Sequence, residues 1–192
     1  MRILTPTLLA VWSAAALAGT EHSVDAETGL ATWQTETGGV QVRLTQISPD
    51  QARAFYPARG FSAPAAERYA AECVFMTVVR NTGDTPIRHR LADWRYLHAG
   101  QARALRSKTE WERLWQKQGV AEPARIAFNW AQFPATQTFA PGDWNQGMTT
   151  YSVPRGGQFD LRFVWRTLKG INAGGKTHSG TLEQVRCADE TS

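Results

Sequence analysis

The residues of this sequence whose side chains could hold a metal ion are spread along the chain. They are four histidines and two methionines: His22, His89, His98, His178, Met76 and Met148. Copper accepts imidazole and thioether ligands. His89 and His98 fall on two segments that we predict to be neighbouring strands, so their rings could converge, whereas Met76 falls in an apolar segment typical of a core. A copper site that uses His89, His98 or His22 is therefore the alternative hypothesis for function.

The two cysteines, Cys73 and Cys187, lie far apart in the sequence. An even number of thiols favours pairing in an oxidising compartment, and this crosslink would tie an early strand to the last one. In the loop-entropy model, closing so long a loop stabilises the fold by roughly 4 to 5 kcal/mol. Two other interpretations stay open, namely a pair of buried free thiols or two ligands of a soft metal.

Aromatic residues beside arginines predict a contact surface for a partner. Trp, Tyr and Arg dominate interface energetics, because they bury much area with few rotatable bonds and can stack. The predicted contact residues are Tyr56, Arg59, Phe61, Trp94, Arg95 and Trp144. Trp111, Trp115 and Trp165 have periodic apolar neighbours, so we assign them to the core. The alternative is that the guanidinium groups only cover indole rings on the protein surface.

No recognisable catalytic pattern is present in the sequence. It contains no Gly-flanked serine elbow, no phosphate-binding loop, and no H-E-x-x-H or C-x-x-C motif. The carboxylates of Glu110 and Glu112, or of Asp143 and Asp160, could pair in space, but their spacing does not predict it. We therefore expect a protein that is not an enzyme and that carries no cofactor.

The composition limits the class of protein. The 192 residues are 42% apolar and 20% charged, and the mean hydropathy is -0.39. These values exclude a multi-span membrane protein and a disordered chain. The net charge of +4 comes mostly from arginines that form no continuous basic run. Nucleic acid is therefore not an expected partner, because phosphate binding requires clustered positive charge.

The first 18 residues have the layout of a signal peptide. A basic start is followed by the apolar run Leu8–Leu17 and by the small-x-small pattern Ala16-Leu17-Ala18. The run is shorter than the ~20 residues that span a bilayer, so we predict cleavage and a periplasmic or secreted product without an integral membrane segment. Polar, aperiodic residues 19–38 predict a mobile N-terminal arm, and residues 39–192 a single domain.

Period-two alternation of apolar and polar residues dominates after Val40. It predicts half-buried strands at Val40–Thr45 and Phe159–Trp165. Cys73–Val79 is apolar or small on both faces, which predicts a central strand covered on both sides. Weaker strands are predicted at Ile87–Leu91, Trp94–His98, Ala102–Leu105, Ile126–Phe133, Met148–Val153 and Thr181–Cys187.

Two short helices are predicted between these strands. Ser48–Gln51 contains an N-cap serine, a proline at the first helical position and a capping-box glutamine. Ser107–Glu110 carries a capping box of the same kind. The apolar side chains that follow it recur at helical spacing and predict a stripe that packs on a sheet: Trp111, Leu114 and Trp115.

The turns between the strands carry a family resemblance. The relevant segments are Val78–Ile87, which contains Asn81-Thr82-Gly83-Asp84, then Phe139–Gly142, Gly147, Tyr151–Pro154 and the strand Phe159–Trp165. In this arrangement the chain resembles the small exported immunoglobulin-like β-sandwich domains of bacteria, over roughly Val40 to Cys187. The resemblance implies a mostly β fold, an immunoglobulin-like antiparallel β-sandwich with one or two short helical insertions. It implies no activity, because function resides in sites and not in folds.

These observations favour an exported, non-catalytic binding or accessory protein of the cell envelope. We expect it to engage a protein partner of the envelope through the loops that carry aromatic residues and arginines, because loops often carry function. A periplasmic copper-binding protein is the alternative.

The first prediction concerns the mature N-terminus. Cleavage after Ala18 leaves Gly19-Thr20-Glu21-His22, and we expect it because a cut one residue later would put bulky Leu17 where small residues are required. Intact mass spectrometry of the exported protein should therefore show a chain that begins at Gly19. A chain that begins at Thr20 and holds one equivalent of copper, lost in His22→Ala, would contradict this, because His22 would then be third and could complete a square-planar site.

Overall fold

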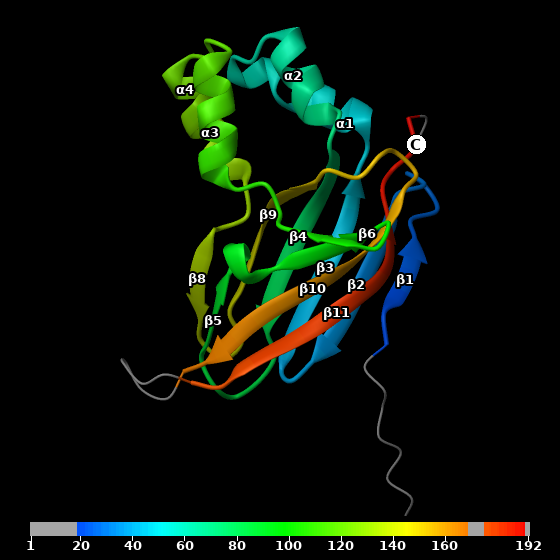
Figure 1. Cartoon of the computed structure of the whole chain (residues 1–192), viewed down its shortest axis with the longest axis vertical. Helices are drawn as coiled ribbons and strands as arrows, with labels where there is room; N and C mark the ends of the chain where they lie inside the picture. The colour runs from blue at the N-terminus through cyan, green and yellow to red at the C-terminus, as the bar shows by residue number, and fades with distance from the viewer. Residues whose placement is uncertain (1–18, 169–174, 191–192) are drawn as a thin grey trace, which may run out of the picture.

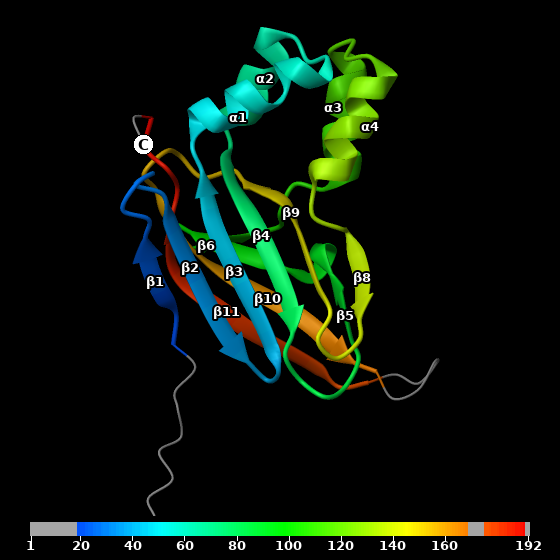
Figure 2. The same ribbon diagram turned by 180° about the vertical axis from the view of Figure 1, so that it is seen from behind.

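The computed structural model describes residues 19–168 and 175–190, so the predicted signal peptide lies outside the described residues. Within these ranges the chain is mostly β, with two antiparallel sheets and four α-helices. The helices gather at one end of the sheets (Figure 1; Figure 2 shows the view from behind). None of the described helices is long and apolar enough to cross a membrane.

The first sheet has the strand order β1-β2-β3-β4-β9, and every neighbouring pair is antiparallel. Its strands are β1 (Glu21–Val24), β2 (Ala31–Thr37), β3 (Val40–Ile47), β4 (Cys73–Asn81) and β9 (Trp144–Tyr151). β4 lies inside this sheet between β3 and β9, as its apolar sequence predicts.

The second sheet has the order β7-β6-β10-β5-β8, with β11 also paired to β10. Its strands are β5 (Ile87–Arg90), β6 (Arg95–His98), β7 (Gln101–Arg103), β8 (Thr136–Phe139), β10 (Gln158–Thr167) and β11 (Thr177–Arg186). β5 and β6 follow one another along β10: β5 is opposite residues 165–167, and β6 is opposite residues 160–162. A short 3-10 helix, η2 (Leu91–Asp93), separates them.

The two sheets face each other across a shared apolar core. Alternating side chains of β3, β4 and β10 point into it, and Val42, Leu44 and Leu161 are fully buried. Rings from the two sheets meet there: the ring centroids of Phe75 and Phe159 lie 5.9 Å apart. The expectation of a mostly β fold built from antiparallel strands is therefore confirmed.

The four helices are α1 (Pro49–Phe55), α2 (Ala63–Ala70), α3 (Lys108–Lys117) and α4 (Glu122–Ala131), and a 3-10 helix, η1 (Pro57–Arg59), follows α1. Both predicted capping boxes are present. Ser48 and Gln51 cap each other at the start of α1, and Ser107 and Glu110 do so at the start of α3. Each box satisfies two backbone N–H groups that a helix start leaves without an intrahelical partner.

A second apolar core lies between the helices and one end of the first sheet. It is rich in aromatic rings, and its large members are Tyr56, Phe61, Tyr69, Trp111, Trp115 and Phe128. The sheet contributes Val74 and Met148. The stripe predicted for α3 is buried in this cluster, where the rings of Trp111 and Trp115 stack at 4.9 Å. Most of its ring contacts are with other helices and not with strands, which the sequence did not predict.

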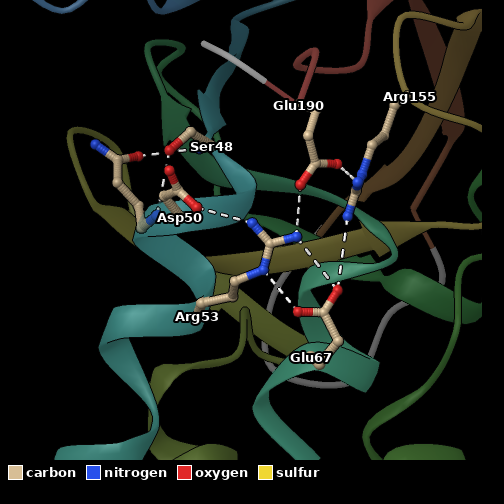
Figure 3. A network of polar contacts seen from close by, with 7 residues as sticks. Ser48, Asp50, Arg53, Glu67, Arg155 and Glu190 are labelled. Carbon is tan, nitrogen blue, oxygen red and sulfur yellow. Dashed lines mark hydrogen bonds and ion pairs between the residues drawn. The ribbon is translucent and has the colours of Figure 1, made fainter. Parts of the chain in front are cut away.

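An ion-pair network ties α1 to α2 and to the C-terminal segment (Figure 3). The Arg53 guanidinium lies 2.8 Å from Asp50, 2.6 Å from Glu67 and 2.6 Å from Glu190. Arg155 also contacts Glu67 and Glu190. The Arg53 guanidinium lowers the pKa of Glu67 below its ordinary value. These groups are partly exposed, so each pair contributes little, and the network serves mainly to orient α1 against α2.

Two of the sequence predictions about elements were wrong, and one helix was missed. Residues 19–38 are not simply a mobile arm, because β1 and β2 lie there and the Trp33 ring of β2 is buried in the core. Residues 126–131 are helical, not a strand, because α4 extends to Ala131. Helix α2 was not predicted, although Ser62 caps it by accepting a hydrogen bond from the Ala65 amide.

The Cys73–Cys187 disulfide is present in the structure, as predicted. It joins the start of β4 to the residue after β11, and therefore links the two sheets. We predict that Cys73→Ser lowers the melting temperature by at least several degrees, because a crosslink of this span contributes roughly 4 to 5 kcal/mol. Thermal unfolding followed by circular dichroism measures the effect, with reduced wild-type protein as the matched comparison. An unchanged melting temperature would contradict it.

Candidate binding cleft

A cleft of about 380 Å³ lies where the helical end of the molecule meets the open edge of the first sheet. Four chain segments form it. They are residues 90–92 around the end of β5, residues 104–111 leading into α3, residues 132–136 between α4 and β8, and residues 148–150 of β9. Its volume lies within the ~300–1,000 Å³ of pockets that hold small ligands.

The segment between α4 and β8 fixes the shape of the cleft by packing directly on β9. The Phe133 amide donates to the Met148 carbonyl at 2.9 Å. A side chain at Gly147 would overlap the Phe133 backbone, since its Cβ would stand 2.4 Å from the Phe133 nitrogen. Glycine is therefore required at position 147 for the close approach of two backbones.

The walls of the cleft are mainly apolar. They include Leu91, Ala104, Leu105, Phe133 and Trp111. The buried indole of Trp111 donates its Nε1–H to Thr150 Oγ1 at 3.1 Å, so the ring is fixed in orientation. Apolar walls with a few oriented polar groups are typical of binding sites.

Three of the charged groups that line the cleft already have partners. Arg106 forms an ion pair with Glu72 at 3.0 Å and lies over the Trp111 ring. Glu110 accepts hydrogen bonds from the Ser107 amide and hydroxyl, both at 2.7 Å, and these bonds lower its pKa. Arg90 is exposed and forms a longer ion pair with Asp93, at 3.8 Å.

Lys108 differs from these groups because it is half-buried without a counterion. Its Nζ donates to the Asn129 carbonyl at 2.8 Å, and no carboxylate of the described residues lies within ion-pair distance. Burial lowers its pKa. Asn129 lies in the last turn of α4, where carbonyl groups lack intrahelical partners, so the lysine also satisfies a helix end.

A second groove, of about 450 Å³, continues from the cleft and shares Lys108 and Gln132 with it. Asn129, Trp130, Pro134, Asn145 and Gln146 complete its lining. The Trp130 side chain is 85% exposed, and neighbouring Ile126 on α4 is half exposed. Exposed apolar groups beside a polar groove mark interaction sites more often than isolated surface residues do.

Three of the six predicted contact residues are core residues. Tyr56 and Phe61 are buried in the aromatic cluster under the helices, and Trp94 is buried between the sheets. Their rings are unavailable to a partner in this structure, so that part of the predicted surface was wrong. Trp94 follows η2 and precedes β6, where the inward-facing ring alternates with the outward-facing Arg95.

The other three predicted contact residues are exposed but do not form one patch with the cleft. Arg59 lies over the Phe55 ring at 3.5 Å and donates to its carbonyl, and Arg95 donates to the carbonyls of Ala92 and Trp94. Trp144 is 58% exposed at the start of β9. Arg59 therefore covers an aromatic ring, as the alternative interpretation supposed, and any role of these three residues in binding stays a prediction.

The histidines do not converge. His89 is opposite Trp165 on β10, whereas His98 lies beyond Leu97, which is opposite Asp160. About six residues of strand separate them, or about 20 Å. The His98 ring is bonded to the Gln158 carbonyl, and His22 packs on Trp33. The expected convergence of His89 and His98 was wrong, and no group of three or more His, Cys, Asp or Glu side chains that could hold a metal occurs among the described residues.

The carboxylate pairs considered from the sequence have separate hydrogen-bonding roles. Glu112 binds Arg125 at 2.7 Å, while Glu110 caps α3. Asp143 accepts from the Ala140 amide, and Asp160 accepts from the Gln184 amide. Each therefore orients backbone or side chains of its own surroundings.

Sequence reasoning missed Lys108, Gln132 and Trp130. Lys108 lies within the predicted capping box, and Trp130 lies within the predicted strand Ile126–Phe133. The proximity of Lys108 to Trp130 becomes apparent only in the structure, where α3 and α4 lie side by side. The available signal was the spacing of Ile126 and Trp130, four residues apart and so on one face of a helix.

Comparisons with known proteins find no matching family model and no matching curated protein. One solved structure with a similar arrangement is that of a Bacillus subtilis protein described as a "putative lipoprotein (ycdA)". It is 12% identical, with a TM-score of 0.40, and the match covers 79% of this chain and 38% of that protein. A likeness of this size supports no statement about the fold or function of this chain.

The buried imidazole of His89 predicts a pH dependence of stability. Its ring contacts Phe133 and Phe139, its nitrogens have no hydrogen-bond partner among the described residues, and burial lowers its pKa to about 4. Because unfolded histidine binds a proton near pH 6.5, stability should be full above that pH and fall by about 1.4 kcal/mol per unit between 6.5 and 4.

The measurement is urea unfolding from pH 4 to 8 for wild type, His89→Phe and His98→Gln. Carboxylates titrate alike in all three proteins, so the difference between the curves isolates the histidine. The His89→Phe curve should lose the added slope and the His98→Gln curve should keep it. Parallel curves for wild type and His89→Phe would show that His89 is not the cause.

Proposed function

We propose that this protein is an exported, non-catalytic binding protein of the cell envelope, and that it engages a protein partner through the cleft and the adjoining groove. The observation that carries the proposal is a largely apolar cleft that opens beside the exposed Trp130 ring. This location replaces the loop surface expected from the sequence, in which three of the six side chains are buried.

The proposal of a non-catalytic role is supported by the state of the polar groups in the cleft. Of its described lining residues, Glu110 is the carboxylate, and both its capping bonds are made within α3. Catalysis by a carboxylate acting as acid or base would require one that is free to exchange a proton with a substrate. Glu110 instead caps α3 and Arg106 is paired with Glu72, so both groups fix the walls of the cleft, and Lys108 is left as a donor that suits binding of a ligand.

Export is supported by the disulfide, since disulfides persist mainly in oxidising compartments. The signal-peptide layout of residues 1–18 supports the same location. Together they favour the periplasm or the outside of the cell as the place where the partner is met.

We further propose that the two-sheet body is immunoglobulin-like. The proposal is supported by strand order. β3, β4 and β9 follow the order A-B-E of an immunoglobulin sheet, and β8, β5, β10 and β11 follow the order C′-C-F-G. On this reading, α1 and α2 form an insertion before strand B, and α3 and α4 form one between strands C and C′.

The fourth prediction tests the cleft with a substitution that fills it. Ala104 is exposed and lines the cleft, whereas Ala102, two residues earlier on β7, does not. Ala104→Trp should therefore block entry without disturbing a core, and Ala102→Trp adds the same surface elsewhere. The mature proteins are immobilised, and proteins retained from an envelope extract are quantified by mass spectrometry.

We expect at least one protein to be retained by wild type and Ala102→Trp and to be reduced about tenfold by Ala104→Trp. Trp130→Ala should cause a similar loss, because a central tryptophan contributes at least about 1 to 2 kcal/mol to an interface. Circular dichroism establishes that each variant is folded. Retention that is the same for all four proteins would contradict the proposed function.

A further inference from the structure

We propose that the partner presents a carboxylate to Lys108 while an apolar side chain beside that carboxylate enters the cleft. This inference rests on the proposed function, because it names the chemistry of the segment that the cleft would bind. The occupant is a linear segment of a protein in which an acidic group and an apolar side chain are adjacent.

The first argument is the position of the lysine. Lys108 is shared by the cleft and the groove, so a segment that runs from one to the other must pass it. Its Nζ is held by the Asn129 carbonyl at 2.8 Å, which uses one of the three donors of an ammonium group. Two donors remain for a ligand.

The second argument is charge. Three cationic side chains, Arg90, Arg106 and Lys108, line the cleft together with one carboxylate, Glu110. Glu72 neutralises Arg106 and Asp93 pairs with Arg90, while Lys108 has no carboxylate within ion-pair distance among the described residues. A half-buried cation without a counterion is costly, so an anionic group that enters here gains more than one bound at an exposed lysine.

The third argument is the environment around the lysine. Leu105, Phe133 and Trp111 form apolar walls in the same cleft. A free inorganic anion would leave these walls hydrated, whereas an apolar side chain next to a carboxylate would satisfy both surfaces. This combination occurs either at a peptide C-terminus that ends in an apolar residue or at an Asp or Glu beside one.

Three peptides serve as probes of this chemistry: N-acetyl-Leu-Phe with a free carboxylate, its neutral amide, and N-acetyl-Leu-Phe-Asp amide. Each is titrated into the full-length mature protein in low salt and followed by the amide and indole signals in nitrogen-15 NMR spectra. We expect at least one charged peptide to bind at least fivefold more tightly than the neutral amide. Which of the two does so distinguishes a chain terminus from an internal acidic side chain.

Lys108→Gln should reduce the affinity for the charged peptide to that of the neutral amide and leave the latter unchanged. Lys108→Arg should retain the preference, which separates the effect of charge from any effect on folding. Lys117→Gln is the matched control, because Lys117 is exposed at the other end of the same helix. High salt should weaken only the charged peptides.

Equal binding of charged and neutral peptides would overturn the carboxylate assignment and leave the proposed function standing. A charge preference that survives Lys108→Gln but is lost in Arg90→Gln would overturn it as well, because the anion would then sit at Arg90. Failure of all three peptides to bind at peptide concentrations up to about 10 mM would also overturn it. The proposed function fails separately, when Ala104→Trp leaves partner capture unchanged.

Discussion

The side chain of Gln132 connects the helices to the sheets, and the cleft depends on this connection. Its Nε2 donates to the Tyr56 hydroxyl at 3.0 Å, and its Oε1 accepts from the Tyr69 hydroxyl at 3.2 Å. Tyr56 follows α1, Tyr69 belongs to α2, and Gln132 follows α4. The Tyr56 hydroxyl also donates to the Met148 sulfur on β9 at 3.4 Å. One buried amide therefore joins three helical segments to a strand.

This network has to be complete to be stable. A buried amide or hydroxyl without a partner costs about 1 to 3 kcal/mol, and here each group compensates the others. Burial raises the pKa of both tyrosines, so the hydroxyls remain protonated donors. Since Gln132 also lines the cleft and the groove, the residue that holds the helices in place also forms part of the proposed binding site. The ion pairs of Arg53 lie at the surface and add orientation to an arrangement that this buried network sets.

Local patterns in the sequence predict the elements that are half-buried in a regular way. The alternation in Phe159–Trp165 and the capping boxes at Ser48 and Ser107 correspond directly to β10, α1 and α3. α4 was misread because Ile126, Phe128 and Trp130 alternate as in a strand. In the helix, Phe128 faces the aromatic core while Ile126 and Trp130 share the exposed face.

The site could not be predicted in the same way, because its four segments lie far apart in the sequence and meet only when α3 and α4 pack over β9. The predicted surface of aromatic residues and arginines was partly wrong for a related reason, namely that neighbours in the sequence need not lie on the same face. Where an inward-facing ring alternates with an outward-facing arginine, as at Trp94 and Arg95, neighbours in the sequence end on opposite sides of a sheet. Adjacency along the chain therefore overstated the number of exposed rings.

The exposure of Trp130 has a different origin, because this residue lies on a helix and not on a strand. The apolar face of α4 that packs in the core is formed by Ala124 and Phe128. Trp130 and Ile126 are exposed on another side of this helix, and Trp130 lines the groove together with Lys108. An exposed apolar ring and a half-buried ammonium group without a counterion are more stable when a partner covers them. In this protein both lie on one continuous surface, which begins in the apolar cleft and passes the end of α4.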